Sequence, residues 1–432
     1  MKNIFGKIVG IVLTIAMLAS CMSFATFADA AAAPFSGSGT EADPYLISTP
    51  QDLVTLEGLT NVKSTDDNAK YAAAYYMLTQ DINMKDVTFN GLCKSEDASG
   101  NWSASVGFSG TIDGDGHIIE NMTIARTTTG TNKANIFGAL ISRANGCTVK
   151  KLGLVNASVS AYQTAAGFIG GRFGSAVTLE DCFIKTITIS TEVEGALNSR
   201  KQSAPFIACA VAGSTIRNCY SLDVNGASEG CAMGDYSSSS YKQSTAENCY
   251  STNRFFSGRG ITHTNGLQSI DSATEEEISA FITASNGAFE ADTFGQNSGY
   301  PVLAWENDFL SGGSGTESDP FLLSTADDLV ELSELTNLNT DAYNTFDSAY
   351  YKLTNDIDMT GVQNFYGICP RRGDSAAYSN TGSFSGTIDG NYHTISNITI
   401  NACNVNGYAG LVAYTSAAAT IKNLVVNTVT FN

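Results

Sequence analysis

Two stretches of the chain are near copies of each other: FSGTIDGDGHIIENMTI from Phe108 to Ile124 and FSGTIDGNYHTISNITI from Phe384 to Ile400. They agree at 12 of 17 positions, and their offset is 384 − 108 = 276 residues. GTEADPYLIST from Gly39 and GTESDPFLLST from Gly315 keep that offset. The sequence therefore predicts one complete unit over 35–310 and the start of a second over 311–432, and we expect more units in a complete protein.

The apolar residues of the copied stretch predict short bent strands. Ile119 and Met122 are three residues apart, so a straight strand could not keep both on one face, and we expect a bend at Glu120–Asn121. In steps of 30, 30, 37 and 30 from Ile119, the same spacing begins again at Val149, Leu179, Ile216 and Ala246. Bent strands that recur once per coil, without a 3.6-residue period, are typical of a parallel β-solenoid.

Short helices are expected at the ends of the coils. Ser48 to Asp52 combines a hydroxyl cap, a proline in the first turn and an acid, and Thr325 with Asp327 repeats the pattern in the second copy. Residues 274–289 carry acids in their first turn and should form a helix that covers the end of the stack. The segment GYPVLAW, residues 299–305, would then close the first unit.

The first 30 residues have the pattern of a signal peptide. Lys2 and Lys7 precede an apolar run, and Ala28-Asp29-Ala30 supplies small residues for cleavage. Leu18-Ala19-Ser20-Cys21 also resembles a bacterial lipobox, so a lipid anchor at Cys21 is an open alternative. In both cases we expect an exported protein.

Charge and hydropathy narrow the classes of partner. The net charge is −19, with 42 acidic and 23 basic residues, which argues against nucleic acid and anionic lipid as partners. Beyond the signal segment, no stretch approaches the ~20 apolar residues of a spanning helix. The 41 glycines and the 15% of charged residues are typical of a turn-rich all-β protein.

Three runs resemble the GLUG motif of bacterial surface proteins: Ala134-Asn135-Ile136-Phe137-Gly138, Ala166-Gly167-Phe168-Ile169-Gly170 and Tyr408-Ala409-Gly410-Leu411-Val412-Ala413. The TIDG start and the GYPVLAW ending are similar to units of pectate-lyase-like proteins. This resemblance covers nearly all of the mature chain. It implies an all-β fold, a right-handed parallel β-helix with short capping helices. It does not imply one activity, because that superfamily contains lyases, hydrolases and adhesins.

Three of the ten cysteines share one position of the predicted coils. Cys182, Cys219 and Cys249 stand where other coils have Met122, Leu152 and Leu424. We interpret them as structural, a stack of buried thiols that act as small apolar residues. Adjacent stacked cysteines could reach a disulfide by distance but meet its torsion requirement poorly. No pair has the spacing of a metal site such as CxxC.

The repeated segment Asp113-Gly114-Asp115-Gly116-His117 invites a catalytic or calcium interpretation. The second copy has Asp389-Gly390-Asn391-Tyr392-His393 and so loses one acid. Glycine with Asp or Asn is what a tight turn requires, and we favour a turn. Calcium is the one cofactor that stays open.

Enzymes of the resembled superfamily provide a stricter comparison. Polygalacturonase-like members carry NTD, DD, GHG and RIK motifs, none of which occurs here. Pectate-lyase-like members use an acid cluster with a catalytic arginine, and the arginines of the predicted coils share no register with such a cluster. We therefore expect no catalytic residue, although three or more carboxylates converging with an Arg or Lys on an outer face would favour an enzyme over an adhesin.

Loops with aromatic residues are the best candidates for ligand binding. The 17-residue loops 91–107 and 367–383 keep an aromatic at the same place, Trp102 and Tyr378, and the Ser/Tyr-rich stretch 234–243 contains Tyr236 and Tyr241. Aromatic rings on loops can stack on sugars or anchor an interface, although these rings could also pack back onto the coils.

The sequence thus favours an exported bacterial binding or adhesion module, at the cell surface or released, without catalysis of its own. Its partner would be an extracellular glycan or a host or cell-surface protein. A pectin-lyase-like lyase or hydrolase is the first alternative, and a stalk or spacer of a larger surface protein is the second.

Overall fold

The copied TID segment forms a three-residue strand in both units, β4 (Thr111–Asp113) and β24 (Thr387–Asp389). Strand side chains alternate between two faces, so Ile112 and Ile388 are buried while the preceding threonines are partly exposed. The computed structural model describes residues 33–61, 66–94, 107–126, 136–162, 164–172, 175–191, 202–208, 213–226, 244–252, 261–267, 269–292, 297–307, 310–336, 344–362, 365–369, 383–401 and 409–432.

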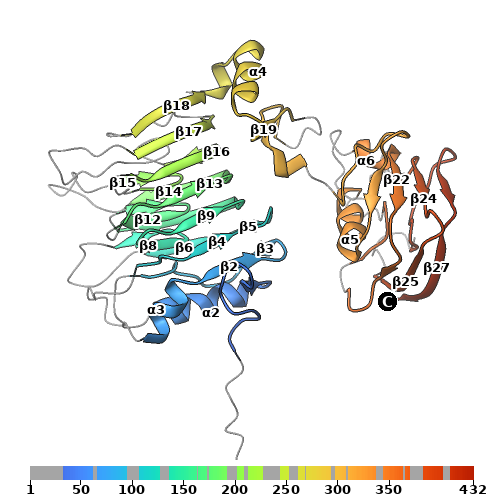
Figure 1. The fold of residues 1–432 in the computed structure, drawn as a ribbon, viewed down its shortest axis with the longest axis horizontal. Coiled ribbons are helices and arrows are strands. Elements are labelled where there is room, and N and C mark those ends of the chain that lie inside the picture. Colours follow the sequence, from blue (N-terminus) through green and yellow to red (C-terminus); the bar gives the residue numbers. More distant parts are fainter. Residues whose placement is uncertain are drawn as a thin grey trace, which may run out of the picture.

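In the first unit, β4 belongs to one wall of a curled, all-parallel sheet (Figure 1). Each coil of chain contributes one strand, and each strand pairs in parallel with the strands of the coils before and after it. The strands of this wall are, in order, β1 (Tyr45–Ile47), β2 (Tyr75–Leu78), β4, β9 (Thr148–Lys150), β13 (Thr178–Glu180), β16 (Thr215–Asn225), β17 (Ser244–Ser251) and β18 (Ile261–Leu267).

A bend leads from this wall to the next one. The residues at this bend, Lys151, Asp181, Asn218 and Asn248, have a φ between +47° and +53°. The chain also bends at Asn121, with a φ of +56°, but this bend lies within the second wall, because the residues before and after it both pair with residues 153–161. Its counterparts on the following coils are Asn156, Thr186 and Asp223, with a φ of +51°, +61° and +50°. The second wall contains β3 (Ile82–Asn83), β5 (Ile118–Glu120), β6 (Thr123–Arg126), β10 (Gly153–Ala161) and β14 (Phe183–Thr191), and β16 continues into it.

One step of the predicted register is wrong. Val149 pairs with Ile112, whereas Ile119 pairs with Leu154 on the second wall. The first coil contains a turn, Gly114 to His117, between its two strands, and this insertion makes the spacing in the sequence misleading. The later steps, from Val149 through Leu179 and Ile216 to Ala246, are confirmed.

Short strands form the remaining side of the coils: β7 (Phe137–Gly138), β8 (Ile141–Ala144), β11 (Thr164–Ala166), β12 (Ile169–Arg172) and β15 (Gln202–Ala204). The described parts of the first two GLUG-like runs lie here. Small residues in and beside these runs allow close packing, because Ala139, Ala166 and Ala208 form a buried cluster of their own. The large core between the walls consists of stacked aliphatic and aromatic side chains.

Helices cover the ends of the first unit as expected. At one end, α2 (Pro50–Thr60) begins at Thr49, whose side chain forms a capping box with Asp52, and α3 (Asp66–Ala72) follows. At the other end, α4 (Glu275–Ala284) lies beyond β18 and is capped by Thr274 and Glu277 (Figure 1).

The segment after α4 covers a flank of the coils and not only their end. It contains β19 (Phe289–Glu290), β20 (Val302–Leu303) and the 3₁₀ turn η3 (Ala304–Asn307), and another 3₁₀ turn, η2 (Ile270–Ser272), precedes α4. Trp305 of η3 stacks on Phe183 of β14, with ring centroids 5.5 Å apart. Leu303 is buried in the same cluster.

The second unit repeats the beginning of the first around a separate core. Its helix α5 (Ala326–Leu335) has the same capping box, made by Thr325 with Asp328, and α6 (Asn344–Ser348) follows. Its strands are all parallel: β21 (Phe321–Leu323), β22 (Tyr350–Leu353), β24 and β26 (Thr420–Lys422) on one wall, and β23 (Ile357–Asp358), β25 (Thr394–Ile400) and β27 (Val425–Phe431) on the other.

The protein is therefore mostly β, with a large curled sheet of parallel strands and a few short helices, and its coils are solenoid-like. The handedness of the coils and the unit boundary at 310/311 stay predictions. Among the described residues, no helix has both the length and the apolar character needed to cross a membrane.

Candidate functional site

Charged residues of alternating sign occupy one outward position on successive coils of the first wall. Asp113 pairs with Lys150, Lys150 with Glu180, Glu180 with Arg217, and Arg217 with Glu247 in the strand register. We refer to these five residues as the charge ladder. The second unit has a shorter version, with Lys352, Asp389 and Lys422 in consecutive register. Opposite charges placed directly across parallel strands favour this register over a slipped one.

Ion pairs within the charge ladder join one coil to the next. The Lys150 Nζ lies 3.0 Å from Asp113 Oδ2, which also accepts a hydrogen bond from the Tyr75 hydroxyl at 2.7 Å. The pKa of the Lys150 ammonium is raised, first by its hydrogen bond with Tyr75 and then by Asp113. Arg217 donates from Nε and Nη2 to Glu180 Oε1 at 3.0 and 2.5 Å, and this contact raises the pKa of the Arg217 guanidinium. The primary role of these charges is structural, since they join neighbouring coils.

Amide side chains form a second ladder where the first wall bends. Asn218 Nδ2 donates to Asp181 Oδ1 at 2.7 Å, Asn248 Nδ2 to Asn218 Oδ1 at 2.8 Å, and Asn265 Nδ2 to Asn248 Oδ1 at 2.6 Å. Each of these residues has the left-handed backbone that Asp and Asn tolerate better than most side chains. The amide ladder fixes the bend and turns polar groups toward one edge of the wall.

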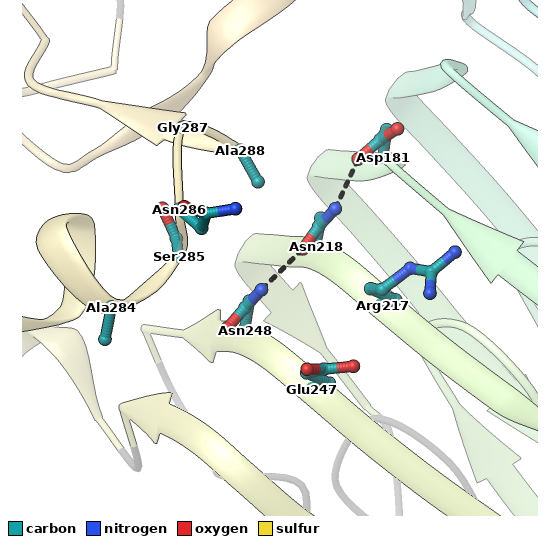
Figure 2. Close-up of a pocket in the computed structure, with 10 residues that line it drawn as sticks. All are labelled: Asp181, Arg217, Asn218, Glu247, Asn248, Ala284, Ser285, Asn286, Gly287 and Ala288. Carbon is teal, nitrogen blue, oxygen red and sulfur yellow. Dashed lines mark hydrogen bonds between the residues drawn. The ribbon is translucent and has the colours of Figure 1, made fainter.

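A groove of about 460 Å³ lies between this ladder and the end of α4 (Figure 2). Asp181, Asn218 and Asn248 line one side, with Arg217 and Glu247 beside them, and residues 284–288 line the other side. Burial raises the pKa of the Asp181 carboxyl. The lining offers hydrogen-bond donors and acceptors and no aromatic ring, so the groove suits a polar ligand that makes many hydrogen bonds.

Two carboxylates and one guanidinium line this groove, and the sequence did not predict that. Asp181, Arg217 and Glu247 come from three successive coils. A third carboxylate, Glu180, is already bonded to Arg217. Their shared register is visible in the sequence segments TLED (178–181), TIRN (215–218) and TAEN (245–248). In each segment, a threonine and an apolar residue are followed by a charged residue and then by Asp or Asn.

The aromatic candidates Trp102, Tyr378, Tyr236 and Tyr241 lie outside the described residues. Their role in binding stays a prediction.

The three cysteines, Cys182, Cys219 and Cys249, lie on successive coils. Cys219 pairs with Cys249 in the register, and Cys182 precedes Phe183, the partner of Tyr220. All three are buried and unpaired as disulfides, and each Sγ donates to the carbonyl two residues earlier, at 3.1, 3.1 and 3.0 Å. Burial raises the pKa of the Cys249 thiol to about 12. Leu152 takes the same position as expected, but Met122 instead lies across from Ala157, since Thr123 pairs with Ser158.

The TIDG turn is also as expected. Asp113 Oδ1 accepts from the backbone N–H of Asp115 at 3.0 Å, and Asp389 Oδ1 accepts from Asn391 at 2.9 Å. These carboxylates stabilise a turn and bind a neighbouring lysine. Within the described ranges, no group of three or more His, Cys, Asp or Glu residues is arranged to hold a metal ion.

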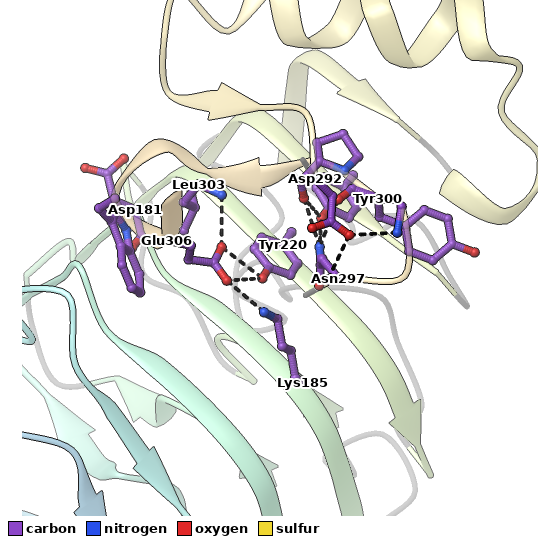
Figure 3. A network of polar contacts seen from close by, with 12 residues as sticks. Asp181, Lys185, Tyr220, Asp292, Asn297, Tyr300, Leu303 and Glu306 are labelled. Atoms are coloured by element: carbon purple, nitrogen blue, oxygen red, sulfur yellow. Dashed lines mark hydrogen bonds and ion pairs between the residues drawn. The ribbon is translucent and has the colours of Figure 1, made fainter. Parts of the chain in front are cut away.

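A further buried acid, Glu306, holds the closing segment against the coils (Figure 3). Its carboxylate accepts from Lys185 Nζ at 2.7 Å, from the Tyr220 hydroxyl at 2.8 Å and from the Leu303 backbone N–H at 2.9 Å. Burial raises the pKa of the Tyr220 hydroxyl, and the nearby Glu306 charge adds to this effect. The network is satisfied internally, and we assign it to structure.

Comparison with known proteins gives distant likenesses. No family model matches the chain. It is 28% identical over 172 residues to halomucin of Haloquadratum walsbyi, a match that covers 37% of this chain and 2% of halomucin. The chain thus spans a small part of that protein. Its structure is similar, with a TM-score of 0.38 and 15% identity, to a candidate immunoglobulin A1 protease from Bacteroides ovatus, over 62% of this chain and 94% of that one.

Proposed function

We propose that this protein is an exported binding module, a right-handed β-helix in at least two units that presents one outer face to an extracellular glycan. The observation that carries the proposal is the groove between the amide ladder and residues 284–288. Amide, carboxylate and guanidinium groups on a rigid wall match the hydroxyl groups of a sugar, because every sugar hydroxyl both donates and accepts. Repetition of units would add avidity for a polymeric ligand.

The charges around the groove restrict the ligand. Two of its side chains are acidic, its arginine is already bonded to Glu180, and the whole chain carries a net charge of −19. A polyanionic glycan would therefore be repelled, and we infer a neutral or amine-bearing sugar.

Binding to a glycan array by the chain from residue 31 onward tests the proposal. Asn286 has a φ of +55° and an exposed side chain in the groove, so Asn286→Gly removes the amide while keeping the turn. We expect at least tenfold weaker binding of the captured glycan with an unchanged melting temperature. Asp115→Gly, a glycine substitution at another left-handed residue, outside the groove lining, is the control for the change in backbone freedom. Equal binding by Asn286→Gly and by the unmodified chain would exclude the groove as the site.

A second candidate function is cleavage of a polysaccharide. Asp181, Glu247 and Arg217 line one groove on three successive coils, and paired carboxylates are what glycoside cleavage requires. Release of reducing or unsaturated ends from a polysaccharide, abolished by Glu247→Gln, would establish this function. A chain that neither binds nor cleaves any glycan would leave a spacer as the best interpretation.

A further inference from the structure

The charge ladder of the first wall ends one coil before the wall does. Its sign alternates from Asp113 to Glu247, and β18, the next strand of the wall, places Thr264 opposite Glu247 in the register. Continued alternation would require a cation at this position, but threonine is uncharged. Thr264 and Glu247 are both exposed, so a cation that is not part of the protein has access to Glu247 on this side.

Arg217, the neighbour of Glu247 on its other side, is already bonded to a different acid. Its Nε and Nη2 donate to Glu180 Oε1 at 3.0 and 2.5 Å. Among the described contacts, Glu247 acts on this guanidinium through its charge alone. Arg217 thus offsets the charge of Glu180, and the Glu247 carboxylate keeps its capacity to accept hydrogen bonds from a ligand.

Glu247 also lines the groove between the amide ladder and the end of α4 (Figure 2). The lining contains a second acid, Asp181, and one cation, Arg217, whose charge Glu180 already offsets. Burial raises the pKa of the Asp181 carboxyl, although Lys151 and Arg217 act to lower it. A positively charged ligand group in the groove would therefore reduce the cost of burying this carboxylate.

We propose that the groove selects a glycan with free amino groups, and that one ammonium of this glycan binds Glu247 beside Thr264, where the charge ladder lacks its next cation. This inference rests on the proposed glycan-binding function and narrows the ligand to a polymer of amino sugars. An ammonium donates three hydrogen bonds and accepts none, so it is complementary to a carboxylate. The hydroxyl groups of the sugar would pair with the side chains of the amide ladder, because each amide both donates and accepts.

Three hexasaccharides that differ only in the group at C2 test the choice of ligand: the β-1,4-linked hexamers of glucosamine, N-acetylglucosamine and glucose. In calorimetric titrations of the chain from residue 31 onward, at pH 6 and 150 mM NaCl, the glucosamine hexamer should bind at least tenfold more tightly than the other two. Hexalysine, which presents amines on a peptide, should bind more weakly than the glucosamine hexamer.

Equal affinity for the three hexasaccharides would overturn the role of the amino group and leave the proposed function intact. No binding of the glucosamine hexamer, or tighter binding of hexalysine, would also overturn it. Failure of the proposed function has a different signature, because the glycan array would then capture no sugar at all.

Removal of the carboxylate tests whether Glu247 binds the amine. Glu247→Gln keeps the size of the side chain and should weaken binding of the glucosamine hexamer at least fivefold, with an unchanged melting temperature. Glu41→Gln makes the same change in net charge at an exposed acid outside the groove lining and should change the affinity less than twofold. Equal losses in the two variants would show that the net charge of −19 attracts the hexamer, and would overturn the site.

A lysine at position 264 tests the place of the ammonium. Thr264→Lys would supply the missing cation of the charge ladder from within the chain, so it should weaken binding of the glucosamine hexamer at least fivefold without lowering the melting temperature. Thr264→Met adds a side chain of similar length without charge and should change the affinity less than twofold. Equal losses in the Lys and Met variants would mean that the added side chain blocks the groove by its size, and would overturn the placement of the ammonium beside Thr264.

Discussion

Arg217 on one coil donates two hydrogen bonds to a single carboxylate oxygen of Glu180 on the preceding coil. The pair lies in a ladder whose sign alternates at every coil from Asp113 to Glu247. A parallel stack has no hairpin turns to set its register, so side-chain pairs on the outer face must help to do so. The ladder therefore specifies which strand of a coil lies over which strand of the next.

Reversing the charge at Arg217 should destabilise the first unit. Arg217→Glu would place three acids, at 180, 217 and 247, directly over one another, and like charges in facing strand positions repel. We expect a lower midpoint of urea unfolding in 50 mM NaCl and a smaller loss in 500 mM NaCl, because salt screens partly exposed charges.

Lys85→Glu is the control for Arg217→Glu, since it makes the same change in net charge at an exposed residue outside the ladder. If both variants shift the midpoint equally, then net charge and not the ladder determines the effect.

The solenoid-like fold was predictable because its main signal is local. The spacing around Asn121 required a break in the alternation of faces, and the chain has a left-handed residue at the same position of the following coils, at Asn156, Thr186 and Asp223. The register between the first coils was not predictable, since the turn at Gly114–His117 is absent from the next coil and shifts the apolar spacing. That turn moved the partner of Val149 from Ile119 to Ile112.

The candidate site was largely not predictable from spacing alone. Asp181 and Glu247 are 66 residues apart in the sequence (247 − 181) and line one groove only because two coils of different length are stacked. Ala284 to Ala288 join them from a segment that closes the stack.

The three stacked cysteines should resist chemical modification in the folded protein. Cys182, Cys219 and Cys249 are buried, which keeps the reagent from them, and burial raises the pKa of the Cys249 thiol to about 12, so little Cys249 thiolate forms at pH 8.5. We expect iodoacetamide to leave these three residues unlabelled without urea and to label all of them in 8 M urea, as peptide mass spectrometry would measure. Labelling of Cys219 in the folded chain would contradict the buried stack.

Asp347 should make the second unit less stable as the pH rises. It takes the place of Ala72 in the first unit: Ser385 N donates to Asp347 O at 2.7 Å, as Ser109 N donates to Ala72 O at 2.8 Å. Burial raises the pKa of its carboxyl from 3.8 to about 6. The folded state binds the proton of the Asp347 carboxyl more tightly than the unfolded state does, so protonation of Asp347 stabilises the second unit. This stabilisation is complete below pH 3.8 and is lost as the pH rises through 6.

Asp347→Ala should therefore gain stability relative to the unmodified chain between pH 3.5 and pH 7.5, by at most about 3 kcal/mol. Hydrogen exchange of the strand Tyr350–Leu353 would report the change locally. Ala72→Asp should reduce the stability of the first unit over the same range of pH. The same pH dependence in Asp347→Ala and in the unmodified chain would show that Asp347 is not responsible.

Glu306 should be essential for docking of the closing segment. Glu306→Ala would leave the Lys185 ammonium and the buried Tyr220 hydroxyl without this acceptor, at a cost of about 3–5 kcal/mol. Glu306→Gln keeps an acceptor for Tyr220 and should lose less stability.

In a Trp102→Phe background, the fluorescence of Trp305 measures docking, because its ring is stacked on Phe183. We expect a red shift and faster chymotryptic cleavage within 285–307, which contains Phe, Leu and Trp but no Lys or Arg, for Glu306→Ala. The paired replacement Lys185→Met with Glu306→Leu should recover part of the loss, because a buried charge without its partner costs more than an apolar contact. Identical behaviour of the Ala and Gln variants would mean that packing of Trp305 and Leu303 alone holds the segment in place.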